Sequence, residues 1–151
     1  AYNLREMSNL RTPLISVVIG EGGSGGALGI GVTDRILMLE HSVYSVISPE
    51  GCAAILWRDA AYKKEAAKAL KLTSKDILEL KIADEVIPEP IGGAHSDWDS
   101  ASKNVRQSIQ RHLVELCATD IDELLSNRWM KYESIGQWRE NTTNQGGDLE
   151  T

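Results

Sequence analysis

Five glycines fall within the seven residues 20–26, directly after an apolar run that ends in Val17, Val18 and Ile19. Ala27 and further apolar residues follow. This order predicts a buried strand, a tight turn and the first turn of a helix. Glycine lets another molecule approach the main chain closely, and the free N–H groups of a helix start lie at the positive end of its dipole. The stretch therefore predicts a backbone site for negative charge.

Three chemical interpretations fit the spacing of these residues. Gly20, Gly22 and Gly25 give G-x-G-x-x-G, typical of dinucleotide binding, and Glu40 lies 20 residues after Gly20, where a ribose-binding acid would fall. A second spacing, G-x-S-x-G centred on Ser24, matches the nucleophile elbow of serine hydrolases. The third interpretation is an oxyanion hole built from main-chain N–H groups. A turn that only lets a helix pack closely on a strand is the structural alternative.

The rest of the chain favours the oxyanion hole. A dinucleotide-binding fold needs further βαβ units, but no strand pattern follows residue 90. A hydrolase needs a histidine beside Ser24, and none of His41, His95 and His112 has a local setting that marks it as a base. His112 lies in an amphipathic segment, where we expect it at the surface. The dinucleotide interpretation rests on spacing alone.

Composition narrows the function further. A length of 151 residues with 42% hydrophobic residues predicts one globular domain. The net charge of −6 argues against nucleic-acid binding, and no apolar run approaches the ~20 residues of a membrane helix. Cys52 and Cys117 lack metal-binding spacing and are expected to be reduced and partly buried. We expect no metal site.

The hydrophobic pattern predicts alternating short elements and then two long helices. Strands are expected at 14–19, 36–39, 43–47 and 83–87, and helices at 1–10, 25–32, 48–57, 62–70, 73–80, 98–117 and from 120 onward. Ser48 followed by Pro49 predicts a capped helix start, and Ile55 and Leu56 are expected to face inward. The lysines on the outer face of the 62–70 helix and just after it are expected to be solvated, with an anion-binding role as the alternative; they are Lys63, Lys64, Lys68 and Lys71. The apolar stripes of the two last helices predict that they cover a neighbouring half or subunit.

Several long segments resemble one family, the carboxyltransferase α subunit of bacterial and plastid acetyl-CoA carboxylase, within the crotonase superfamily. These segments are residues 3–8 (NLREMS), 18–28 (VIGEGGSGGAL), 45–57 (SVISPEGCAAILW) and 87–95 (IPEPIGGAH). The resemblance runs from residue 1 to residue 138. Family members are roughly twice as long, so the chain resembles their C-terminal half. The polar segment 139–151 has no family counterpart and is predicted to be disordered.

The resemblance implies a crotonase-like (ClpP/crotonase) α/β superhelix of short strands and helices that ends in long covering helices. It implies transfer of CO2 from carboxybiotin, held on a separate biotin carboxyl carrier protein, to acetyl-CoA, which gives malonyl-CoA for fatty acid biosynthesis. The implied partners are that carrier protein and a carboxyltransferase β subunit in an α2β2 assembly, in the bacterial cytoplasm or the plastid stroma. A non-catalytic crotonase-like scaffold is the alternative.

Within this resemblance, the α subunit supplies the biotin side of the active site. The backbone N–H groups of Gly25 and Gly26 are the expected donors to the ureido oxygen of biotin, which becomes negative when CO2 leaves. Gly22, Gly23 and Ser24 are expected to shape the turn on the biotin side. No side chain is required as a base. The family's site also needs a turn from the missing half, so the chain alone is expected to be inactive.

Overall fold

The computed structural model describes residues 2–136. The elements follow the order α1 (Tyr2–Ser8), β1 (Ile15–Val18), β2 (Glu21–Gly23), α2 (Ser24–Ile30), β3 (Arg35–Leu39), β4 (Val43–Ser45), α3 (Pro49–Leu56), η1 (Ala60–Tyr62), α4 (Lys63–Leu70), α5 (Ser74–Glu79), β5 (Glu85–Ile87), α6 (Trp98–Ala118) and α7 (Ile121–Ser134). The predicted disordered tail at 139–151 lies outside the described residues. All the expected helices and strands form, with boundaries that differ by a few residues.

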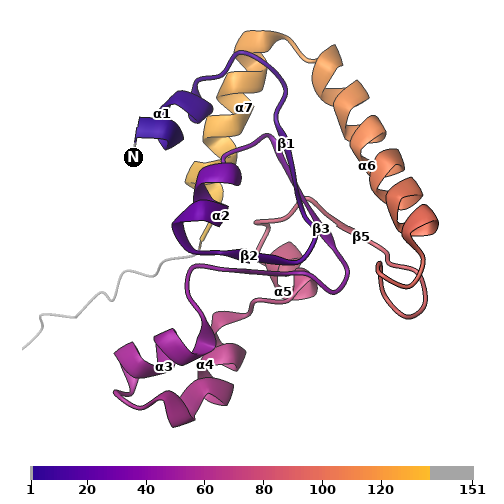
Figure 1. Ribbon diagram of the computed structural model, residues 1–151. Helices are drawn as coiled ribbons and strands as arrows, with labels where there is room; N and C mark the ends of the chain where they lie inside the picture. Colours follow the sequence, from indigo (N-terminus) through magenta and orange to yellow (C-terminus); the bar gives the residue numbers. More distant parts are fainter. Residues whose placement is uncertain (1, 137–151) are drawn as a thin grey trace, which may run out of the picture.

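A three-stranded parallel sheet lies at the centre of the molecule (Figure 1). Its order is β1-β3-β5, with Ile15 opposite Arg35 and Leu37 opposite Glu85. The central strand β3 is apolar along almost its whole length, which is typical of a parallel strand covered on both faces. On one face, Ile36 and Met38 pack with Ile77 of α5. On the other face, Leu37 packs with residues of β5 and α6.

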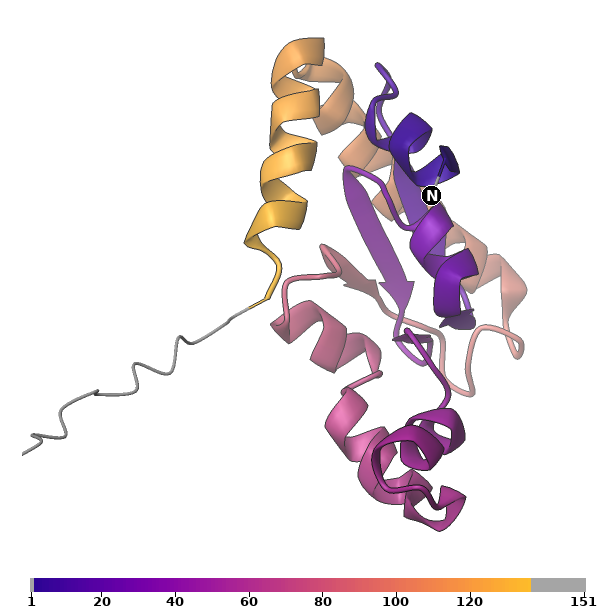
Figure 2. The same ribbon diagram turned by 90° about the vertical axis from the view of Figure 1, so that its left-hand side faces the viewer.

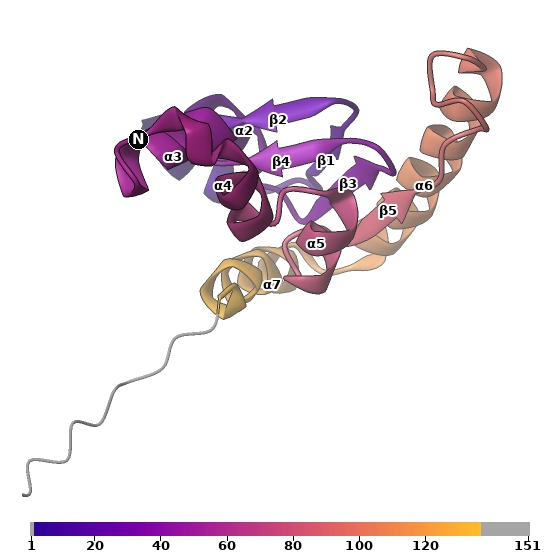
Figure 3. The ribbon, with the colours of Figure 1, turned by 90° about the horizontal axis from the view of Figure 1, so that it is seen from below.

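A second, two-stranded sheet lies across the end of the first (Figures 1 and 3). It pairs β2 with β4 in parallel, with Gly22 opposite Tyr44 and Gly23 opposite Ser45. The sequence predicts only a tight turn at residues 20–24, and that prediction is incomplete because the turn contains this strand. The three residues of β2, EGG, carry neither β-branched side chains nor alternation. Their pairing depends on β4, 22 residues further along the chain.

Helices α3 and α4 form a hairpin that projects away from both sheets (Figure 2). The Ser48 hydroxyl caps α3 by accepting from the Gly51 N–H at 3.1 Å, as its sequence predicts. The hairpin has a small core of its own, built around Cys52, Ala53 and Ala66. The prediction that Ile55 and Leu56 face inward is wrong: they are 69% and 65% exposed. Two short helices with small core residues can bury only one narrow face, and these two residues lie outside it.

The two long helices α6 and α7 lie on different sides of the central sheet (Figure 1). Helix α6 packs its Val105 and Ile109 on the sheet, whereas Val114 on the same helix is 71% exposed. Trp129 and Met130 of α7 are each 52% exposed. Both helices therefore expose part of their apolar surface. Within residues 2–136, no helix is long and apolar enough to span a membrane.

Candidate active site

The glycine-rich stretch leads from one sheet to the other and then into α2. The Gly20 carbonyl accepts from the Val43 N–H at 2.9 Å, which brings the chain into line with β4. After β2, Ser24 takes a left-handed backbone conformation with φ of +57°. Such a conformation costs a residue other than glycine roughly 1–2 kcal/mol, and strained residues of this kind cluster at functional sites. The bend at Ser24 therefore joins β2 directly to α2.

The amino end of α2 carries the proposed donors. Gly23, at the N-cap, has no side chain that could cap the helix, and Gly25 and Gly26 lie exposed in the first turn. An open groove of about 590 Å³ lies beside this turn. It is lined by residues of α1 and α2, namely Tyr2, Asn3, Leu4, Met7, Gly25, Gly26, Gly29 and Ile30. Main-chain N–H groups without a cap at the rim of a groove suit a negatively charged ligand atom.

The glycines of this region fall into two groups. Gly22 and Gly31 are required by packing, since a Cβ at Gly22 would lie 2.7 Å from Cδ2 of Tyr44 and one at Gly31 would collide with the Tyr44 hydroxyl. In contrast, a Cβ at Gly25, Gly26 or Gly29 would meet nothing within 4 Å.

Contacts within residues 2–136 do not explain why Gly25, Gly26 and Gly29 are glycines. Gly25, Gly26 and Gly29 are absent from the residues with positive φ, and glycine is a poor helix former. The free space beside these three helical glycines would let a ligand or another protein segment, from outside residues 2–136, approach the main chain closely. The five predicted site residues, Gly22, Gly23, Ser24, Gly25 and Gly26, are consecutive and form the bend and the first turn that border this space.

The histidines do not form a hydrolase site with Ser24. The His41 ring pairs with the Glu89 carboxylate, with Nδ1 and Oε2 at 3.2 Å. Nε2 of His112 lies 2.7 Å from Oε2 of Glu85, and the His95 side chain is exposed. Among residues 2–136, Ser24 Oγ makes no hydrogen bond to a histidine, so the structure gives the nucleophile-elbow interpretation no base.

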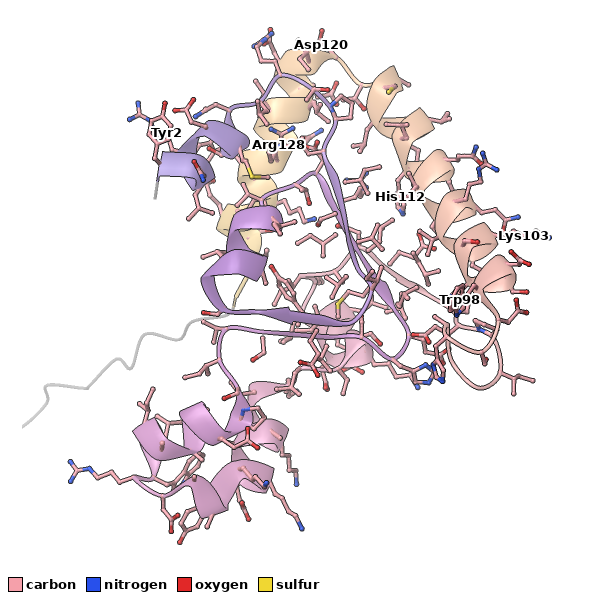
Figure 4. All side chains as sticks on the ribbon, viewed as in Figure 1. Tyr2, Trp98, Lys103, His112, Asp120 and Arg128 are labelled. Atoms are coloured by element: carbon pink, nitrogen blue, oxygen red, sulfur yellow. The ribbon has the colours of Figure 1, made fainter. Side chains whose placement is uncertain are left out.

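His112 is not the surface residue that its helical pattern predicts. Its side chain is only 12% exposed, and it points from α6 toward the sheet (Figure 4). Glu85 of β5 accepts hydrogen bonds there from Ser108, Arg111 and His112. Partial burial alone would raise the pKa of Glu85, but these hydrogen bonds outweigh it and lower that pKa. The cluster joins β5 to α6, away from the glycine-rich turn.

The remaining candidate residues, namely Glu40, the lysines near α4 and the two cysteines, lie outside the glycine-rich turn. Glu40 is half-buried, and its carboxylate accepts from the Glu89 N–H at 3.3 Å, so this carboxylate already has a partner within the fold. Lys63 and Lys64 are exposed, and Lys63 lies 3.7 Å from Glu50. Of the two cysteines, Cys52 is buried and Cys117 is exposed; both are free thiols, but the expectation that Cys117 is partly buried is wrong.

No group of three or more His, Cys, Asp or Glu side chains within residues 2–136 is arranged to hold a metal ion. Two tyrosines that the sequence does not single out, Tyr44 and Tyr132, place their hydroxyl groups at the carboxyl end of α2. The Tyr44 hydroxyl donates to the Ala27 carbonyl at 3.0 Å. The Tyr132 hydroxyl lies within hydrogen-bond distance of the Gly31 and Thr33 carbonyls. Both tyrosines are separated from α2 in sequence, and no local motif marks them.

Solved structures identify the fold. A Pseudomonas malonate decarboxylase hetero-tetramer, solved in complex with coenzyme A, contains a chain that superposes with a TM-score of 0.68 at 17% identity, over 83% of this chain and 50% of that one. The transcarboxylase 12S subunit, solved as a hexamer, superposes with a TM-score of 0.54 at 21% identity, over 99% of this chain and 25% of that one. The arrangement of short parallel strands, glycine-rich turn and long terminal helices is the crotonase-like α/β fold.

Sequence comparison identifies the family. Residues 1–136 match the family model described as acetyl co-enzyme A carboxylase carboxyltransferase-like. Acetyl-coenzyme A carboxylase carboxyl transferase subunit alpha of Staphylococcus saprophyticus is 53% identical over 140 residues, which cover 93% of this chain and 45% of the relative. The corresponding subunit of Prochlorococcus marinus strain MIT 9515 is 54% identical over 143 residues, covering 95% of this chain and 43% of the relative. The chain belongs to this carboxyltransferase α-subunit family and spans less than half the length of these relatives.

Proposed function

We propose that this chain is the part of an acetyl-CoA carboxylase carboxyltransferase α subunit that carries the main-chain donors of the biotin side. The complete enzyme would transfer CO2 from carboxybiotin to acetyl-CoA, forming malonyl-CoA for fatty acid biosynthesis. Family membership supports the reaction class. The observation that supports the location is the exposed first turn of α2, where Gly25 and Gly26 have no side-chain cap and open space beside them.

The residues present fit a biotin group. Carboxybiotin would supply the CO2, and negative charge would develop on its ureido oxygen. The N–H groups of Gly25 and Gly26 would donate to that oxygen. Because the helix fixes these groups before the charge appears, they need little reorganisation when it forms. Side chains at Gly25, Gly26 or Gly29 would fill the space that the ring needs. This accounts for three glycines that packing among residues 2–136 does not require.

The proposed partners are a carboxyltransferase β subunit and a biotin carboxyl carrier protein, in an α2β2 assembly. The subunit designation of the relatives supports a multi-subunit enzyme. Apolar surface on α6 and α7, at Val114, Trp129 and Met130, supports contacts beyond this chain. We place the enzyme in the bacterial cytoplasm or the plastid stroma. The chain by itself would lack carboxyltransferase activity, because it cannot hold both substrates in attack geometry.

The test replaces single N–H groups in the complete, assembled enzyme. Semisynthesis with glycolic acid in place of Gly26 turns one amide into an ester, which removes one donor and keeps the shape. We expect turnover to fall by about 10²–10³, the loss found on removing one oxyanion-hole donor, with little change in KM for the CoA substrate. The matched control places the same ester at Gly92, in the exposed loop beside Ile91, and should keep full turnover.

A second variant separates this site from a nucleophile elbow. Ser24→Ala removes the hydroxyl but leaves the backbone donors in place, so turnover should change little. If Ser24 were the catalytic nucleophile, this variant would lose its turnover. Full turnover in the Gly26 ester, or abolished turnover in Ser24→Ala, would show that the oxyanion assignment is wrong.

A further inference from the structure

Helix α2 is too weak to hold its own shape. It has only seven residues, three of them the glycines 25, 26 and 29, and no side chain caps its amino end. Glycine is the poorest helix former after proline, and isolated helices shorter than about 12 residues are marginal in water. The geometry of its first turn must therefore come from contacts with other elements.

One of these contacts comes from α7. The Tyr132 hydroxyl accepts a hydrogen bond from the Thr33 N–H at 2.8 Å and lies 2.5 Å from the Gly31 carbonyl, to which it can donate. Gly31 is the C-cap of α2, and its own N–H returns to the Ala27 carbonyl at 2.8 Å. Tyr132 thus fixes the carboxyl end of α2 to a helix almost a hundred residues away in sequence.

The other contact comes from β4. The Tyr44 hydroxyl donates to the Ala27 carbonyl at 3.0 Å, and the Tyr44 ring fills the space that Gly22 and Gly31 leave open. Both tyrosines are partly buried, which raises the pKa of each phenol, so both hydroxyls keep their protons near neutral pH. Two hydroxyl groups from different elements therefore hold the same end of α2, opposite the turn that carries Gly25 and Gly26.

We infer that Tyr44 and Tyr132 are positioning residues that set the direction in which the Gly25 and Gly26 N–H groups point. The inference rests on the function proposed above. Neither tyrosine needs to touch the substrate. Oxyanion donors work through fixed placement, and small misplacements in an active site are costly. The glycines leave the first turn of α2 open for a ligand, and the two tyrosines support the helix at its carboxyl end.

Hydrogen exchange on the full chain tests the support without any substrate. Tyr44→Phe and Tyr132→Phe each remove one hydroxyl and keep the ring. The hydrogen-bonded amides of α2 should exchange roughly three- to tenfold faster in each variant, as the loss of one hydrogen bond predicts. The buried amides of β3 serve as the internal reference, because general destabilisation would speed up both sets. Tyr62→Phe, an exposed tyrosine stacked on Trp57, is the matched control and should change neither.

Turnover of the assembled enzyme tests whether the two tyrosine hydroxyls affect catalysis. In Tyr44→Phe and Tyr132→Phe we expect kcat to fall about three- to tenfold with KM for the CoA substrate unchanged, well below the melting temperature of each variant. Unchanged exchange in α2, or equal acceleration in α2 and β3, would overturn the inference. So would normal turnover in both variants while the Gly26 ester is inactive. If the ester itself is fully active, the proposed function fails as well, which keeps the two failures distinguishable.

Discussion

The guanidinium of Arg128 binds both carboxylate oxygens of Asp34, with Nε to Oδ1 at 2.8 Å and Nη2 to Oδ2 at 2.9 Å. The two side chains are 1% and 3% exposed. Arg128 also donates to main-chain carbonyls at the end of α1 and in the segment that follows it, including those of Leu10 and Thr12. In Figure 4 its side chain extends from α7 toward this segment. One buried residue therefore connects α7 to the residue before β3 and to α1, which lines the groove beside Gly25 and Gly26.

This pair gives the first prediction. Arg128→Met leaves the Asp34 carboxylate buried without its partner, so the free energy of unfolding should fall by about 3–5 kcal/mol. Urea unfolding followed by circular dichroism measures the loss. The control is Arg11→Met, which breaks an ion pair with Asp122 whose side chains are 56% and 78% exposed, and it should cost no more than about 1 kcal/mol. Equal losses in the two variants would contradict the role given to burial.

Local sequence signals predicted much of this fold. The apolar run of β3 and the capped start of α3 are readable from a few neighbouring residues. So is the capping box of α5, in which Thr73 and Asp76 bond each other. Each depends on interactions within about four residues, and composition or periodicity records such interactions directly.

The supports of the candidate site were not predictable in this way. The glycine-rich turn marks the donors, but Asp34 and Arg128 lie 94 residues apart, and Tyr132 meets Thr33 from a distance of 99 residues. Strand β2 exists only through its pairing with β4. An arginine in an amphipathic helix is usually solvated, so nothing local distinguishes Arg128 from an exposed residue. The roles of Arg128, Tyr132 and strand β2 depend on tertiary contacts between distant parts of the sequence.

The two groups of glycines give the second prediction. In the chain alone, Gly25→Ala should raise the free energy of unfolding by up to about 1 kcal/mol, because alanine favours the helix and its Cβ meets nothing within 4 Å. Gly22→Ala should lower it by about 1–3 kcal/mol, since its Cβ would overlap the Tyr44 ring. Urea unfolding compares the two. In the assembled enzyme, Gly25→Ala should reduce turnover despite its greater stability; stability and turnover rising together would show that the open space has no function.

Glu85 gives a prediction on pH. Burial alone would raise its pKa, but the hydrogen bonds from Arg111, Ser108 and His112 lower it below the ordinary value of 4.5. A carboxyl group with a lowered pKa in the folded state stabilises the fold above its unfolded pKa, and loses that effect as the pH falls through the folded pKa. Glu85→Gln should therefore lower Tm by at least about 2–4 °C at pH 6, with the gap from wild type closing below pH 4.5.

Thermal unfolding between pH 3 and pH 7 measures this gap. Glu79→Gln is the control, because Glu79 is exposed on α5 and makes no ion pair within residues 2–136. Its Tm should follow wild type at every pH. A gap at Glu85→Gln that stays constant down to pH 3 would mean that the carboxylate charge is not what stabilises the β5–α6 contact.

The last prediction concerns the outer edge of β1, which within residues 2–136 pairs only with β3. The Leu14 carbonyl accepts from the Arg35 N–H, and bonding alternates along a parallel strand, so the N–H groups of Ile15 and Val17 point away from β3. An apolar hollow of about 260 Å³ adjoins this edge, and Ile19 beside it is 73% exposed. An unpaired apolar edge is a template for another strand. We expect the remaining part of the family's domain to supply it.

Produced separately, the unmatched portion of the Staphylococcus saprophyticus relative should therefore bind this chain. Val17→Pro should weaken that binding at least about tenfold, because proline removes an outward N–H yet is tolerated on an edge strand. Val17→Ala is the matched control, since both variants lose side-chain contacts with the core while only proline loses the donor. Calorimetric titration of the two variants measures the difference, and circular dichroism verifies that both are folded. Equal affinities for Val17→Pro and Val17→Ala would show that the partner does not add a strand at β1.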